Sequence, residues 1–237
     1  MGEKDFLLAV MTEPAVFAGE AEYLEGLLEA GVAKLHLRKP RAKRWELEVL
    51  LKRLAPRWAS RLVIHGSHEL AARYGVPQIH GSAGLIGSAG AGSAGAGSAE
   101  AGSAGAGSAE SGSAGEGLAA VRSADAGALP VISTSVHSWE ELKALPRGLA
   151  YAFISPLFDS ISKPGYGANK ALLQQPPGPL PCMPVGLGGI SADTIGEMIR
   201  YGWKGAAVLG WIWERPEDAV GRFEQLKKII DEQGVTG

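Results

Sequence analysis

Short apolar runs and amphipathic stretches alternate along almost the whole chain, and this alternation restricts the fold more than any other feature. Eight runs are long enough for strands buried on both faces of a sheet: residues 6–10, 33–37, 61–65, 77–80, 130–134, 150–155, 183–187 and 205–210. Helical spacing marks residues 16–30, 43–56, 67–74, 139–144, 191–201 and 216–232. Alternating strands and helices are typical of a parallel α/β sheet, and eight strands favour closure into a single (β/α)8 TIM barrel.

The helix ends carry further signals. The last predicted helix has Pro216 near its start and apolar residues at helical spacing from Val220 to Ile230. Ser191 directly follows a glycine pair, and we expect it to be the N-cap of the helix over 191–201. The helix after the fourth strand has to come from residues 117–126.

One segment has no globular pattern. Residues 87–116 repeat a pentad of the type GSAGA. Gly, Ser and Ala bury too little apolar area to offset the entropy of ordering the backbone, so we expect a flexible insert within one barrel domain spanning residues 1–237. Stacked silk-like strands are the alternative, which Glu100, Glu110 and Glu116 disfavour. Lengthening a surface loop costs little, so the barrel is expected to tolerate the insert.

The bulk composition limits the kinds of partner. The net charge of −2 gives no general attraction to nucleic acid or to anionic lipid, so any anion site must be local. Cys182 is the only cysteine, which excludes an intrachain disulfide. The sequence has no signal-peptide pattern and no run of about 18 apolar residues. We therefore expect a cytoplasmic protein that binds a small molecule, with no nucleic-acid or membrane partner.

Polar residues gather where the predicted strands end. The active site of such a barrel lies at the carboxyl ends of its strands, so these residues are the candidates. In chain order they are His36, Arg38, His65, His80, Ser133, Ser135, His137, Ser160, Ser162, Lys163, Gly188, Gly189 and Gly210. Four of the five histidines are among them.

Each candidate also has a purely structural interpretation. The glycines in GLGGIS and VLG suit a phosphate held on backbone N–H groups, but tight turns also use glycine. Arg38 either binds an anion or is one more solvated charge in RKPRAKR. His65 and His80 are either catalytic or stacked core residues. His137 suits proton transfer, but a histidine at a helix start also serves as a cap. Lys163 is either an anion ligand with Ser160 and Ser162 or a surface lysine.

Taken together, these loops resemble the thiamine phosphate synthase and TenI family over nearly the whole chain except the insert. KLHLRKP is similar to the second-strand signature, LVIHGSHELA to the third-strand segment, and STSVHSWEEL to the fifth-strand Ser-x-His motif. SPLFDSISKPGYG is similar to the Thr-x-Thr-Lys loop, and VGLGGIS to the Gly-Gly phosphate cradle. The resemblance implies that the substrate and its phosphate are bound by Arg38, His36, Ser135, Ser160, Ser162, Lys163 and the three glycines. His65 and His80 are possible additional contacts.

The family contains two chemistries. Synthases join an aminopyrimidine pyrophosphate to a thiazole phosphate with Mg²⁺ held on two aspartates. Here His65 and Gly66 replace the third-strand Asn-Asp pair, and no Asp or Glu lies between residues 70 and 99. TenI-like members are thiazole tautomerases that need no metal, and their proton carrier is the histidine of Ser-Val-His-Ser, here His137.

The sequence thus favours a metal-independent thiazole tautomerase that binds a phosphorylated thiazole and holds no cofactor. Mg²⁺ is expected only if the chain is a synthase, which is the first alternative. The second is a non-catalytic barrel that binds thiamin intermediates and regulates a partner. A homodimer is compatible with the sequence, because barrels often form dimers.

Overall fold

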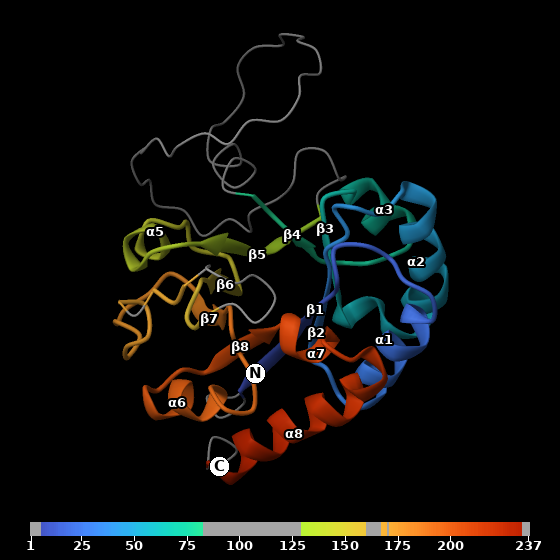
Figure 1. The fold of residues 1–237 in the computed structure, drawn as a ribbon. Coiled ribbons are helices and arrows are strands. Elements are labelled where there is room, and N and C mark those ends of the chain that lie inside the picture. Colours follow the sequence, from blue (N-terminus) through green and yellow to red (C-terminus); the bar gives the residue numbers. More distant parts are fainter. Residues whose placement is uncertain (1–5, 83–128, 160–166, 170, 234–237) are drawn as a thin grey trace, which may run out of the picture.

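The strands of the chain close into one parallel barrel, in which each strand pairs with the next and β8 pairs with β1 (Figure 1). The computed structural model describes residues 6–82, 129–159, 167–169 and 171–233. The strands are β1 (Leu7–Met11), β2 (Lys34–Leu37), β3 (Leu62–His65), β4 (Ile79–His80), β5 (Val131–Val136), β6 (Tyr151–Ile154), β7 (Met183–Leu187) and β8 (Gly205–Val208). The predicted (β/α)8 barrel is confirmed.

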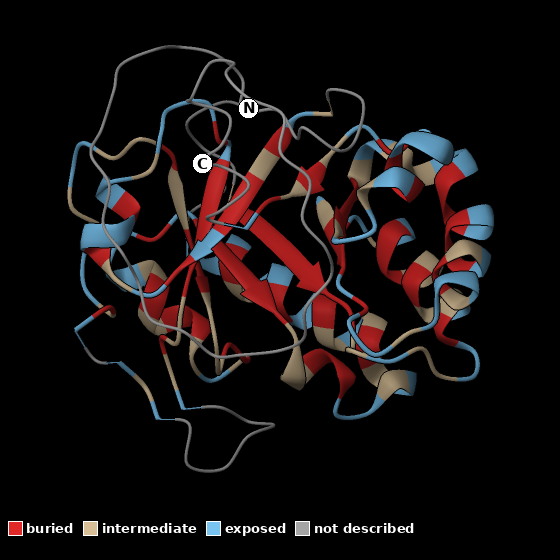
Figure 2. Ribbon diagram, turned by 90° about the horizontal axis from the view of Figure 1, so that it is seen from above, coloured by how far each residue is buried: buried red, intermediate tan, exposed pale blue. Residues whose placement is uncertain are grey.

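The helices surround the barrel. They are α1 (Glu20–Glu29), α2 (Arg44–Trp58), α3 (His68–Arg73), α5 (Trp139–Lys143), α6 (Ile195–Arg200), α7 (Gly210–Trp213) and α8 (Ala219–Glu232), with 3-10 turns η1 (Ala59–Arg61) and η2 (Pro216–Asp218). Figure 2 shows largely buried strands and exposed residues on the outer faces of the helices. No helix of the described ranges is long and apolar enough to cross a membrane.

One expectation about a helix start was wrong, and one short helix was not predicted. The helix after β7 starts at Ile195 with Thr194 as its N-cap residue, not at Ser191. The Thr194 hydroxyl donates a hydrogen bond to the Gly189 carbonyl oxygen at 2.9 Å and accepts one from the Ser191 N–H at 2.9 Å. This local turn occupies residues 191–194 and delays the helix. The short helix α7 after β8 was not predicted, because four residues show no periodicity.

Several predicted features lie outside the described residues. They are the insert at 87–116, the expected helix at 117–126, and the loop residues Ser160, Ser162 and Lys163.

The apolar core has two layers separated by the strand wall. Residues that point outward from the strands, such as Val10, Leu35 and Leu37, pack against the helices in the larger cluster. Side chains of alternate residues point into the barrel. The smaller, inner cluster contains Leu7, Ala9, Met11, Tyr151, Phe153, Val185 and Ala207. These residues come from β1 and β6–β8, so they fill only one side of the interior.

Candidate active site at the barrel mouth

The other side of the barrel interior is lined by histidines. His36 of β2 is completely buried. Its Nε2 lies 2.7 Å from the Tyr151 hydroxyl, and its Nδ1 lies 2.8 Å from Nε2 of His65. β2 places Leu35 and Leu37 toward the helices, so strand alternation turns His36 inward. A buried imidazole is thus held at both nitrogens.

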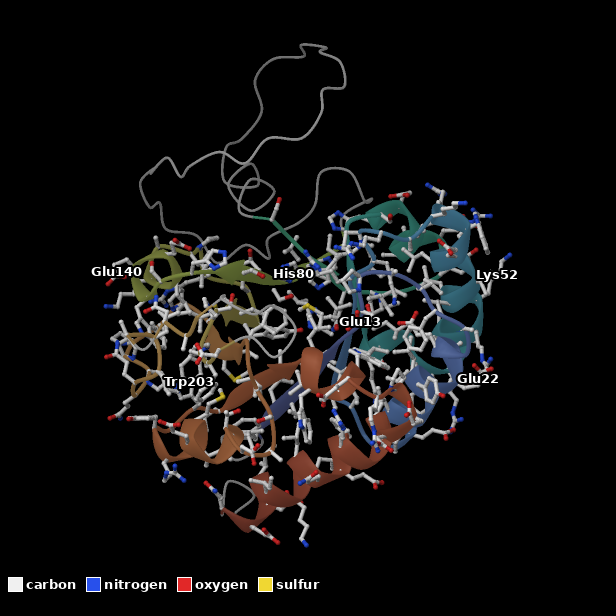
Figure 3. The ribbon with its side chains drawn as sticks, viewed as in Figure 1. Glu13, Glu22, Lys52, His80, Glu140 and Trp203 are labelled. Atoms are coloured by element: carbon white, nitrogen blue, oxygen red, sulfur yellow. The ribbon has the colours of Figure 1, made fainter. Side chains whose placement is uncertain are left out.

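His65 and His80 lie side by side at the ends of β3 and β4. The register pairs these two residues, and their rings stack with centroids 3.9 Å apart and planes 12° apart. Nδ1 of His80 lies 2.9 Å from the Ser133 hydroxyl, and its Nε2 lies 3.3 Å from the Ser135 hydroxyl. Figure 3 labels His80 among the side chains at this end of β4. Four adjacent strands, β2–β5, therefore contribute to one polar network.

Burial keeps these imidazoles neutral. Loss of hydration places the pKa of His36 and of His65 well below the usual histidine range, and it lowers the pKa of His80 to about 4. The Arg38 charge lowers the pKa of both His65 and His80 further. Burial also raises the pKa of the Tyr151 hydroxyl, which stays protonated. The network is an uncharged set of donors and acceptors at neutral pH.

Arg38 follows β2 at the same rim. Its backbone N–H donates to the Thr12 hydroxyl at 3.1 Å, and its side chain is exposed. The neighbouring Lys39 is instead buried and pairs with Glu20 while donating to the Ala15 carbonyl oxygen at 2.9 Å. Lys39 therefore ties the loop to the segment before α1, and Arg38 is the cation that this loop presents to the mouth.

His137 follows β5 and is exposed. Its Nδ1 lies 3.1 Å from the Ser155 carbonyl oxygen. A carbonyl only accepts, so Nδ1 carries the proton and Nε2 is left with its lone pair. The cap of α5 is Ser138, whose hydroxyl accepts from the Glu141 N–H at 3.0 Å, while the Glu141 carboxylate accepts from the His137 N–H at 2.8 Å. The His137 ring is therefore not used as a helix cap.

The glycines after β7 let two loops meet. Gly188 and Gly189 have φ values of 99° and 64°. A Cβ on Gly189 would lie 2.4 Å from the carbonyl oxygen of Asp159, in the loop after β6. The structural reason for this glycine is thus the close approach of that loop as well as its backbone angle. Gly210 is the first residue of α7, directly after β8.

The structure joins some predicted site residues more closely than others. His36, His65, His80 and Ser135 share one network, to which Ser133 and Tyr151 belong. Arg38, His137 and the three glycines follow strands at the same end of the barrel. The hydroxyl of Tyr151 was missed, although a tyrosine at the start of an otherwise apolar strand is a usable signal.

Of three comparisons with known proteins, only the one with solved structures finds matches. No family model matches the chain, and no curated protein matches its sequence. A thiamine phosphate pyrophosphorylase from Bacteroides thetaiotaomicron is 25% identical, with a TM-score of 0.61 over 94% of this chain and 97% of that one. One from Pyrococcus furiosus is 19% identical, with a TM-score of 0.66 over 99% of both chains. A 3-hexulose-6-phosphate synthase, 13% identical, has a TM-score of 0.60 over 94% of this chain and 98% of that one, and shares the fold.

Proposed function

The chain resembles the thiamine phosphate synthase and TenI family in its barrel as well as in its motifs, and from this we propose that it binds a thiazole phosphate at the barrel mouth and acts as a metal-independent thiazole tautomerase. The reaction moves a proton between two positions of a carboxylated thiazole phosphate. Substrate and product then have the same composition, so one acid-base group and an anion anchor are sufficient.

The geometry of His137 is the observation that carries the proposal. The Ser155 carbonyl oxygen 3.1 Å away fixes the proton on Nδ1 and leaves Nε2 as the base. In the proposed step, Nε2 takes a proton from one position of the substrate, and the resulting imidazolium returns it to another. The Glu141 carboxylate accepts a hydrogen bond from the backbone N–H of His137 and so holds that residue in place.

In this proposal, residues at the rim of the barrel hold the ligand. We assign the phosphate to the backbone at Gly188, Gly189 and Gly210, and other anionic groups of the ligand to Arg38. Ser135 adds an exposed hydroxyl beside His80. Ser160, Ser162 and Lys163 are proposed to complete the clamp, on the family resemblance alone.

The residues at the mouth do not fit the Mg²⁺ of a synthase. Mg²⁺ prefers carboxylate and water oxygens. The third and fourth strands end here in His65 and His80, followed by Gly66 and Gly81. These strand ends therefore offer imidazole nitrogens, and glycines that have no side-chain oxygen, where a synthase needs oxygen ligands.

The test is conversion of the carboxythiazole phosphate, followed by NMR, with purified protein in EDTA. The wild-type chain should convert the substrate well above background. His137→Gln removes the base and should lower the rate about 10²–10⁴-fold, the usual contribution of general acid-base catalysis. His68→Gln is a matched control, because His68 lies on α3 and contacts only the His80 backbone oxygen among the described hydrogen bonds. Equal rates for the wild type and His137→Gln would contradict the proposed role.

Two structural neighbours are thiamine phosphate pyrophosphorylases, which favours thiamine phosphate synthase as a second candidate. This activity would join the aminopyrimidine pyrophosphate to the thiazole phosphate with release of pyrophosphate. Formation of thiamine phosphate in Mg²⁺ that stops in EDTA would establish the synthase and overturn the tautomerase. Saturable binding of the thiazole phosphate with neither activity would instead indicate the non-catalytic regulatory barrel.

A further inference from the structure

His36, His65 and His80 form a cluster that takes no part in the proposed proton transfer. Each offers one ring nitrogen, and the three nitrogens all lie within 4.8 Å of one another. No other grouping of three or more His, Cys, Asp or Glu side chains with this spacing occurs in the described ranges. We propose that these three imidazoles bind one late transition-metal ion of the zinc class inside the barrel mouth.

The surroundings of the cluster favour metal ligation. Metal-binding histidines usually have their second ring nitrogen held by an outer partner, which fixes the tautomer. His36 has the Tyr151 hydroxyl at 2.7 Å from Nε2, which leaves Nδ1 on the side of His65. His80 has the Ser133 hydroxyl at 2.9 Å from Nδ1. Two of the three rings are therefore already oriented by neutral oxygen atoms.

The ligand type selects the class of metal. Three imidazole nitrogens without a carboxylate or thiolate select zinc, copper, nickel or cobalt over Mg²⁺ or Ca²⁺. His36 is completely buried whereas His65 and His80 are partly exposed, so a fourth position would face the mouth and take water or an anionic oxygen.

Metal entry has to change three contacts, of which the first is the 3.3 Å contact between the Ser135 hydroxyl and Nε2 of His80. Ligands about 2.0–2.1 Å from a tetrahedral ion are roughly 3.3 Å apart. His36 and His65 are closer, at 2.8 Å, so the ion replaces their hydrogen bond. The stacked rings of His65 and His80 must also tilt, because lone pairs lie in the ring planes and these planes are nearly parallel. The Arg38 charge opposes a cation, so neutralising Arg38 should tighten metal binding.

This inference does not rest on the proposed function. The tautomerase step uses His137, which lies outside the cluster. Metal binding and proton transfer can therefore succeed or fail separately, provided that they are measured separately.

The experiment is calorimetric titration of zinc chloride into the full chain after EDTA treatment and removal of the chelator. We expect one saturable site per chain. His36→Gln, His65→Gln and His80→Gln should each weaken binding more than Tyr151→Phe, which removes an outer partner and should cost roughly 10–100-fold. Arg38→Gln should bind zinc more tightly than the wild type.

His137→Gln is the matched control and should bind zinc as the wild type does, because its ring contacts the Ser155 carbonyl oxygen and lies outside the cluster. Far-UV circular dichroism checks that each variant is folded. Visible absorption of Co²⁺ bound to the wild-type chain needs no variant, and an intense tetrahedral spectrum is expected. Absence of a saturable site, a weak octahedral Co²⁺ spectrum, or equal binding by His65→Gln and the wild type would overturn the proposal.

Discussion

The two sides of the barrel interior differ in chemistry. The side built by β1 and β6–β8 is filled by apolar chains such as Leu7, Val185 and Ala207. The side built by β2–β5 carries three imidazoles with the hydroxyls of Ser133 and Tyr151 around them. Both sides are enclosed by the same strand wall, so burial alone does not require polar residues on one of them.

This difference separates packing from function. Burying a polar group costs free energy unless it is fully hydrogen-bonded, and apolar side chains could fill the same volume. Burying the histidine side therefore costs more free energy than burying the apolar side. We infer that it is retained for binding or chemistry, while the apolar side stabilises the barrel.

The largest effect is expected on the apolar side. Phe153→Ala removes a completely buried ring and should lower the free energy of unfolding by about 3–5 kcal/mol. Urea denaturation followed by circular dichroism measures this loss. A loss below about 1 kcal/mol would show that the inner cluster is not a tightly packed core.

Lowering the pH should destabilise the folded protein through the histidine side of the barrel. His80 has its pKa lowered from 6.5 to about 4 by burial, so the unfolded chain binds a proton below pH 6.5 while the folded chain does not. Stability is then present above pH 6.5 and is lost as the pH falls toward 4. The loss should be on the order of 3 kcal/mol from this group alone.

Urea titrations of the metal-free protein at several pH values test this window. His36 and His65 should add to the same trend, because their pKa values are lowered as well. His80→Gln should show a shallower dependence on pH than the wild type. A free energy of unfolding that does not change between pH 6.5 and 4 would contradict the buried, neutral network.

Substitutions at two glycines allow the loop after β3 to be compared with the loop after β7. Gly66 and Gly189 have similar φ values, 61° and 64°. A Cβ on Gly66 meets nothing within 4 Å, whereas one on Gly189 lies 2.4 Å from the Asp159 carbonyl oxygen. Gly66→Ala should cost about 1 kcal/mol and Gly189→Ala about 2–3 kcal/mol in stability. Equal thermal unfolding of the two variants would show that the loop after β6 does not press on Gly189.

Removal of one hydroxyl should have a similarly small effect. Tyr151→Phe keeps the buried ring but leaves Nε2 of His36 without its partner at 2.7 Å. The expected cost is about 1–2 kcal/mol in the free energy of unfolding. Phe153→Ala, two residues away on β6, gives the comparison for the loss of apolar volume, although its ring also packs against His36 and His80. A larger loss of stability for Tyr151→Phe than for Phe153→Ala would contradict this order.

The sequence predicts the barrel well because strand burial and helix periodicity are local signals. All eight strands lie within two residues of their predicted ends, and the rule that candidates follow strand ends places His36, His65 and His80 at one rim, where the structure has them. Sequence could not show that these rings contact one another, since this depends on strand register. It also missed the role of Tyr151 and the loop contact at Gly189, which arise only from tertiary packing.

The central claim is that the mouth of β2–β5, together with the glycines after β7, binds a phosphorylated thiazole without a metal. Titration of ¹⁵N-labelled protein with the carboxythiazole phosphate in EDTA tests it most directly. We expect saturable chemical-shift changes at the backbone amides of Arg38, His137 and Gly189, with little change along α8. Shifts that do not saturate, or that are confined to α8 and the amino ends of the strands, would contradict it.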